Sequence, residues 1–227
     1  MKKTSNFSFA EHHAAFDDHK ERSIPGYKEL ASCFADLSSR FVQDDTQVVD
    51  YGCSTGRFLA TVRESNRSLR SNVRYVGIDI EEAFRKHWAE LITTDCTFEV
   101  GDVRDSNHAN ISLACSLFVV QFLPSWSKVG FLRRVCDGLV PGGALMIAEK
   151  QLATTGRMQD ALAFQYYDFK QSNGFSAAEI LEKERQLRGQ MTLWTMKEMQ
   201  DILKSSGFRD IQTVWERFPF VGAIALK

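Results

Sequence analysis

The sequence predicts an α/β fold built on a doubly wound, mostly parallel sheet of seven strands. Short apolar runs alternate with amphipathic stretches from about residue 48 to residue 150, which is typical of right-handed βαβ units. A loop with two glycines follows the first apolar run, and an acidic residue ends each of the next two. The last two runs, 208–217 and 218–227, predict an antiparallel hairpin that completes one edge of the sheet.

The elements are expected in a regular order. A turn at Pro25 and Gly26 precedes an amphipathic helix, and Pro141 with the two glycines after it ends the helix before the fifth strand. A helical insertion is expected at about 152–192. We therefore expect an N-terminal lid segment over 1–26 and a single domain over 27–227. The expected strands are 48–52, 73–80, 96–103, part of 112–123 and 144–150, and the helices between them are 57–65, 81–92 and 127–139.

Composition excludes several classes of function. The 227 residues are 44% hydrophobic and 25% charged with a net charge of −1, so no basic field gathers nucleic acid. No apolar run reaches the ~18 residues that span a bilayer, and the first residues lack the apolar core of a secretion signal. Five cysteines without a CxxC pair predict reduced thiols in a cytoplasmic protein rather than a disulfide framework or zinc site.

Three histidines near the start, His12, His13 and His19, are candidate metal ligands. No second cluster of ligands supports a metal site, so we expect none, and we interpret this stretch as a solvated face or a mobile lid.

The stretch VVDYGCSTGRFL, residues 48–59, is the first candidate site. In an open α/β sheet, ligands bind outside the carboxyl ends of the strands, where this loop is expected to lie. Glycine allows the backbone to approach a ligand closely, and the following helix directs its free N–H groups to the same place. Gly52 and Gly56 also suit a plain tight turn, so the loop alone leaves ligand binding and turn formation equally open.

Two acids favour ligand binding. Asp79 ends the second strand, where a carboxylate can accept both hydroxyls of a ribose. Asp102 follows the third strand, where it can accept from the amino group of adenine while the Val103 N–H meets the ring. The loop is not GxGxxG, and Asp50 would repel a pyrophosphate but attract an ammonium or sulfonium group. The pattern therefore predicts S-adenosyl-L-methionine (SAM).

The segments VVDYGCSTG, YVGIDI, EVGDV and LVPGGALMIAEK stand in the order and spacing of class I SAM-dependent methyltransferases, which the chain resembles over about 48–150. This resemblance implies a Rossmann-like fold. A second resemblance extends over nearly the whole chain, to the carboxy-S-adenosylmethionine synthase family. The segments that carry it are NFSF, RSIPGY, RFVQDDTQVVDYGCS, VVQFL, DFKQSNGFSAAEI and VGAIALK. This second resemblance implies a homodimer. It also implies an enzyme that adds a carboxyl group to the cofactor, takes that group from prephenate, and supplies the product for modification of the tRNA wobble uridine. The candidate cofactor contacts are Tyr27, Asp50, Gly52, Cys53, Ser54, Asp79, Ile80, Asp102, Val103 and Leu117.

The chain departs from this family at two positions. Leu117 stands where the family has an asparagine, and Glu184 stands where it has the arginine that holds the added carboxylate. Arg185 follows, but a shift of one residue rotates it by about 100° around a helix. A carboxylate on the cofactor needs a cation, because an unpaired buried charge costs several kcal/mol. Methyl transfer therefore ranks above carboxyl transfer.

The acceptor end of the site is less patterned. Candidate catalytic residues are Arg22, which could hold an anionic group of the acceptor, and Tyr166 and Arg185. Tyr166 could line the acceptor pocket together with Tyr167, although aromatic pairs in helices are more often core. Lys150 could bind an acidic acceptor or only end its strand, and Trp194 is expected to pack against neighbouring helices.

Three functions stay open. The first is a methyltransferase for a small molecule, and the second is a carboxy-SAM synthase with a shifted arginine. The third is a SAM-binding regulator without catalysis. A homodimer is expected, without direct binding to nucleic acid or to a membrane.

Overall fold

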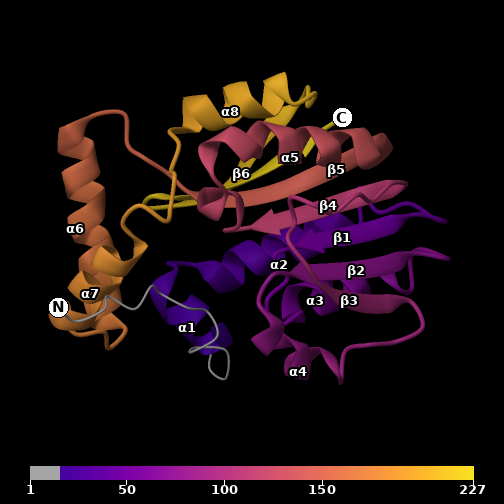
Figure 1. The fold of residues 1–227 in the computed structure, drawn as a ribbon, viewed down its shortest axis with the longest axis horizontal. Helices are drawn as coiled ribbons and strands as arrows, with labels where there is room; N and C mark the ends of the chain where they lie inside the picture. The colour runs from indigo at the N-terminus through magenta and orange to yellow at the C-terminus, as the bar shows by residue number, and fades with distance from the viewer. Residues whose placement is uncertain (1–15) are drawn as a thin grey trace.

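The computed structural model describes residues 16–227 and contains a seven-stranded sheet in the order β3-β2-β1-β4-β5-β7-β6 (Figure 1). The first five strands pair in parallel, and β7 pairs antiparallel with both β5 and β6. The predicted sheet and its C-terminal hairpin are therefore confirmed. The strands are β1 (Gln47–Tyr51), β2 (Arg74–Asp79), β3 (Cys96–Val100), β4 (Ile111–Leu117), β5 (Leu139–Lys150), β6 (Ile211–Arg217) and β7 (Phe220–Leu226).

The strand order creates a switch point at the middle of the sheet. The chain starts at β1, adds β2 and β3 on one side, and then crosses over to place β4 on the other side. The connections on the two sides of β1 therefore leave in opposite directions and open a crevice at its carboxyl end.

Helices cover both faces of the sheet (Figure 1). On one face, α2 (Tyr27–Ser38) and α3 (Arg57–Asn66) bury apolar side chains such as Phe34 against the strands. On the other face, α5 (Ser125–Gly138) and α8 (Met196–Ser205) do the same with side chains such as Phe131 and Leu203. Each helix presents an apolar stripe, and burying it is the main driving force for this arrangement.

The helix expected over 81–92 is much shorter. The structure has a 3₁₀ turn, η3 (Glu82–Phe84), and a single turn of α-helix, α4 (Arg85–Trp88). The Trp88 indole stacks on Phe98 with ring centroids 5.4 Å apart, and its Nε1 donates to the Ser54 carbonyl oxygen at 2.8 Å. The prediction was wrong in length because this tertiary anchoring holds the segment close to the glycine loop.

The Pro141–Gly143 stretch lies inside β5 rather than before it. The pairing of β4 with β5 shifts register here, since Ile111 faces Leu139 but Leu113 faces Ala144. The intervening residues form a bulge, with Gly142 at a φ of 76° that favours glycine.

Three helices lie beyond the carboxyl ends of the parallel strands (Figure 1). They are α1 (Phe16–Ser23), α6 (Gly156–Ser172) and α7 (Ala177–Leu187). A β-bridge between Gln151 and Trp194 closes the base of the segment that carries α6 and α7. Within residues 16–227, no helix combines the length and apolar character needed to cross a bilayer.

Candidate functional site

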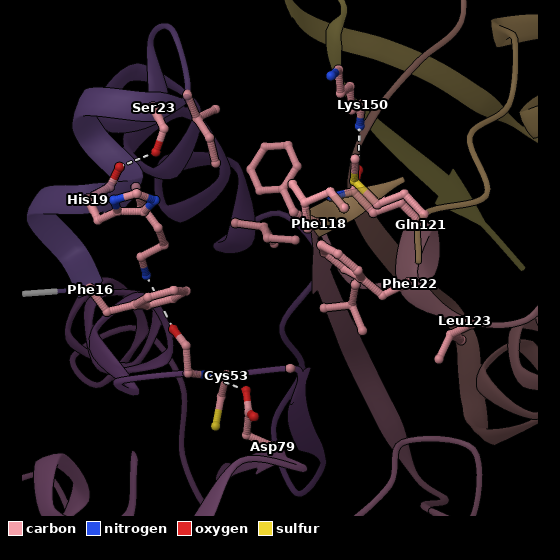
Figure 2. A pocket seen from close by; sticks show the side chains of 18 of the residues that line it. Phe16, His19, Ser23, Cys53, Asp79, Phe118, Gln121, Phe122, Leu123 and Lys150 are labelled. Atoms are coloured by element: carbon pink, nitrogen blue, oxygen red, sulfur yellow. Dashed lines mark hydrogen bonds between the residues drawn. The ribbon is translucent and has the colours of Figure 1, made fainter. Parts of the chain in front are cut away.

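A cavity of about 500 Å³ lies at the carboxyl ends of β1 to β5 and beneath α1, α6 and α7. Figure 2 shows Asp79 and Cys53 at one end of this pocket and Gln121 and Lys150 at the other. The volume is within the range of small-molecule sites. The ten candidate cofactor residues all line it, namely Tyr27, Asp50, Gly52, Cys53, Ser54, Asp79, Ile80, Asp102, Val103 and Leu117.

The glycine loop is shaped by packing within the protein. Gly52 and Gly56 have φ values of 78° and 80°, which side-chain-bearing residues rarely adopt. A Cβ atom on Gly52 would overlap the side chain of Val119, and one on Gly56 would overlap the ring of Phe98. The loop can therefore lie directly against the turn that follows β4, and this close fit forms the floor of the pocket.

Asp79 is fixed by the backbone around it. Its Oδ2 accepts from the Ser54 N–H at 2.8 Å and its Oδ1 accepts from the Glu81 N–H at 2.9 Å. Burial raises the pKa of Asp79, and these two backbone N–H groups oppose that rise. A carboxylate has about four lone-pair sites, so each oxygen keeps capacity for a ligand hydroxyl.

Asp102 already has a cationic partner. The Arg104 guanidinium donates to both carboxylate oxygens, at 3.0 Å and 2.9 Å from Nε, and the backbone N–H of Arg104 donates at 2.9 Å. These hydrogen bonds lower the pKa of Asp102. An adenine amino group would share this carboxylate with Arg104, which also lines the cavity.

Helix α1 is attached to the glycine loop through Asp17 and Lys20. Asp17 accepts from the Thr55 hydroxyl at 2.9 Å and pairs with the Lys20 ammonium at 2.9 Å. Lys20 also donates to the Ser54 hydroxyl at 3.2 Å. Burial raises the pKa of Asp50 to about 7, while the Lys20 charge opposes this shift. The described part of the expected lid therefore covers the acidic end of the cavity.

Three lysines gather at the opposite end. Lys150 ends β5, Lys170 lies on α6 and Lys183 lies on α7. The Nζ atoms of Lys150 and Lys170 each lie 3.9 Å from Oε1 of Glu184, and they lie 4.9 Å and 4.2 Å from the ring centre of Tyr166. Lys170 and Lys183 were not predicted from the sequence. The signal for Lys170 was its spacing of four residues from Tyr166, which puts both on one face of α6.

Of the three candidate catalytic residues, Tyr166 lines the cavity, whereas Arg22 and Arg185 do not. Arg22 donates from Nε to the Asn173 carbonyl oxygen at 3.0 Å, which ties α1 to the end of α6. Arg185 is exposed and lies 3.9 Å from Glu182. The helix turns its side chain away from the cavity because Glu184, one residue earlier, faces inward.

The remaining candidates lie outside the cavity lining or are inert. Tyr167 contacts Tyr166 from outside the lining, and Trp194 packs against the core with the Lys128 ammonium 4.1 Å from its ring centre. Burial raises the pKa of the Cys53 thiol, which does not suit a nucleophile. All five cysteines are free thiols.

Possible metal ligands do not gather in the described part of the chain. Among residues 16–227, no group of three His, Cys, Asp or Glu side chains could hold a metal ion. His12 and His13 lie outside the described residues, and His19 faces the cavity beside Lys183.

Comparison with known proteins identifies relatives over nearly the whole chain. The family model "Methyltransferase domain" matches residues 42–207. A carboxy-S-adenosyl-L-methionine synthase of Shewanella baltica is 32% identical and covers 98% of this chain and 93% of its own length. The enzyme of that name from Actinobacillus pleuropneumoniae is also 32% identical, with 100% and 96% covered.

Solved structures share the fold. Human N-acetylserotonin methyltransferase in complex with SAM superposes with a TM-score of 0.63 at 16% identity. The superposition covers 96% of this chain and 55% of the human chain. Mitomycin 7-O-methyltransferase superposes with a TM-score of 0.62 at 16% identity, with 98% of this chain and 62% of that one covered.

The residues in the cavity fit SAM as the cofactor. An Asp79 carboxylate with free lone pairs suits a ribose diol, and the buried Asp50 favours a positively charged ligand. The chain belongs to the methyltransferase-domain family, and it is a SAM-dependent transferase related to the carboxy-S-adenosyl-L-methionine synthases.

Proposed function

We propose that this enzyme transfers the methyl group of SAM to a small-molecule acceptor. The observation that carries the proposal is the shape of the cavity, which continues from Asp79 past Tyr27 to Tyr166 and the lysines. Helices α1, α6 and α7 contribute side chains to its lining, and this enclosure favours a small acceptor over a macromolecule.

When bound, SAM supplies a methyl carbon activated by the positive sulfur, and the sulfur–carbon bond breaks toward sulfur as the acceptor atom forms its bond. The protein mainly positions the reactants and excludes water. Asp79 would hold the ribose, and Asp102 with the Val103 N–H would hold adenine. The aromatic rings of Phe118 and Tyr166 line the space beyond and exclude water from it.

Tyr166 would act as a hydrogen-bond donor rather than as a base. Its side chain is buried, and burial raises its pKa, with the nearby Glu184 charge adding to the rise. A protonated phenol at neutral pH can orient an acceptor oxygen or nitrogen but cannot remove its proton.

Incubation of the protein with SAM and a panel of small metabolites tests this proposal. We expect S-adenosylhomocysteine to form with one acceptor class and a methylated product to appear in equal amount. Bound SAM that stays intact with every class would contradict methyl transfer and favour the regulatory alternative.

Carboxy-SAM synthase activity is the second candidate, because the relatives at 32% identity carry that name. The physical objection to it is weaker than the sequence suggested. Glu184 does face the cavity, but Lys150 and Lys170 lie beside it, so a ligand carboxylate there would meet cations. Mass spectrometry of the ligand that copurifies with the protein separates the candidates, since a gain of one carboxyl group favours the synthase.

We also propose a homodimer. Met158 and Phe164 of α6 and Leu181 of α7 are exposed apolar side chains, and exposed apolar patches often mark protein–protein contacts. Light scattering after size exclusion would test this, with a monomer mass as the contradicting result. A cytoplasmic location and the absence of a nucleic-acid partner stay predictions.

A further inference from the structure

Two opposite charges lie at the cofactor end of the cavity. Lys20 of α1 and Asp50 of β1 both line it. The Lys20 side chain is 13% exposed and Asp50 is 3% exposed. The two charges act on each other, because burial raises the pKa of Asp50 while Lys20 opposes that rise. The amino-acid part of SAM carries one ammonium and one carboxylate, so this pair can receive it with opposite charges facing.

Lys20 is held at this position by polar contacts on the glycine loop. Its Nζ atom lies 2.9 Å from Oδ1 of Asp17 and donates to the Ser54 hydroxyl at 3.2 Å. The ring centre of Tyr27 is 5.1 Å from the same atom. Ser54 and Tyr27 also line the cavity. The ammonium group therefore lies among the candidate cofactor contacts rather than in solvent.

The Lys20 ammonium is charged and only partly neutralised. Burial acts to lower the pKa of Lys20, but Tyr27 and Asp17 outweigh it and the pKa is raised, so Lys20 is protonated at neutral pH. Asp17 also pairs with Arg57, whose Nε atom lies 3.1 Å from Oδ2. One carboxylate thus faces two cations. A ligand carboxylate would add negative charge here, and it is a stronger acceptor than the Ser54 hydroxyl.

We infer that Lys20 binds the carboxylate of the amino-acid part of SAM, and that Asp50 faces its ammonium group. Lys20 is then a specificity-determining residue for the cofactor, because it favours ligands that keep this carboxylate. The inference requires SAM as the cofactor, but it does not depend on the acceptor or on which group is transferred. The alternative role of Lys20 is mechanical, since through Asp17 and Ser54 it would only fasten α1 to the glycine loop.

Two ligands separate these roles. S-adenosylhomocysteine keeps the amino-acid carboxylate, and its decarboxylated analogue keeps the amine alone. Their affinities are measured by calorimetry at pH 7 on the full chain. The native protein should bind S-adenosylhomocysteine about 10- to 150-fold more tightly than the analogue, the scale of a hydrogen bond to a charged group. In Lys20→Met this ratio should fall by about tenfold or more.

Two further variants test whether loosening α1 is enough to change the ratio. Lys28→Met is the matched control, because Lys28 is an exposed lysine that pairs with Glu21 of α1 at 3.0 Å outside the cavity lining. It should leave the ratio unchanged. Asp17→Asn weakens the attachment of α1 but leaves the Lys20 ammonium in place, so the preference for the carboxylate should persist.

The ratio compares two ligands on one protein, so a general loss of binding cancels from it. An equal loss for both ligands in Lys20→Met, or a preference lost to the same extent in Asp17→Asn, would overturn the inference in favour of the fastening role. If Lys20→Met does not fold, equal affinity of the native protein for the two ligands would still overturn it. Failure to methylate any acceptor class would instead overturn the proposed function and leave this inference standing.

Discussion

Replacing Asp79 with asparagine should weaken cofactor binding through the ribose. The carboxylate accepts two backbone N–H groups, at 2.8 Å and 2.9 Å, and keeps one free lone pair on each oxygen for the diol. Asparagine has one acceptor oxygen, so a ribose hydroxyl loses its charged partner. A hydrogen bond to a charged group contributes about 1.5–3 kcal/mol, which corresponds to about 10- to 150-fold in affinity.

The assay is calorimetric titration with S-adenosylhomocysteine and with its 2′-deoxy analogue. The analogue should bind the native protein more weakly than the parent compound, whereas Asp79→Asn should bind the two almost equally. Asp137→Asn is the control, because Asp137 is an exposed acid on α5. Equal losses for the analogue on both proteins would refute the ribose contact, even if Asp79→Asn weakened binding.

Three further predictions concern the site and the buried strand β5 beside it. Gly52→Ala should lower both the melting temperature and the affinity for the cofactor. The φ of 78° at this position is strained for alanine, and a Cβ atom there would overlap the side chain of Val119. An unchanged melting curve would contradict this packing. Burial raises the pKa of Glu149 to about 8 in the folded protein, above the pKa of about 4.5 that a glutamate has in the unfolded chain. The contribution of Glu149 to the free energy of unfolding is therefore full below about pH 4.5 and is lost as pH rises through 8. Urea unfolding at pH 5, 7 and 9 should show a loss on the order of 3 kcal/mol that is absent in Glu149→Gln, and parallel pH profiles for the two proteins would refute it. Glu184→Arg should retain more of a carboxylated cofactor than the native protein, measured by mass spectrometry of the purified complex, and no gain would mean that this position does not face the cofactor methyl group.

The cofactor end of the site was predictable because its signals are local in the sequence. Asp79 and Asp102 each follow a strand directly, and parallel strands bring their carboxyl ends to one edge. Nine of the ten candidate residues line the cavity for this reason, and Tyr27 reaches it from the start of α2. The role of Gly52 was less predictable, since the side chain that requires glycine there is Val119, 67 residues away in the chain.

The gathering of three lysines at the far end of the cavity was not predictable from local patterns. Lys150, Lys170 and Lys183 come from a strand and two helices, and their convergence depends on how the inserted helices fold back over the strands. A lysine in a helix is normally solvated, so the spacing of four residues from Tyr166 was too weak a signal to mark Lys170 as buried. Arg185, a candidate catalytic residue, lies outside the cavity lining, whereas Glu184, which the family resemblance put at the position of the carboxylate-binding arginine, lines the cavity.

A crystal structure of the protein with S-adenosylhomocysteine tests the central claim most directly. We predict that the ribose hydroxyls lie on Asp79, with adenine between Ile80 and Val103. A nucleoside bound away from Asp79, or a cavity filled by the protein's own Lys20 with the ligand excluded, would contradict it.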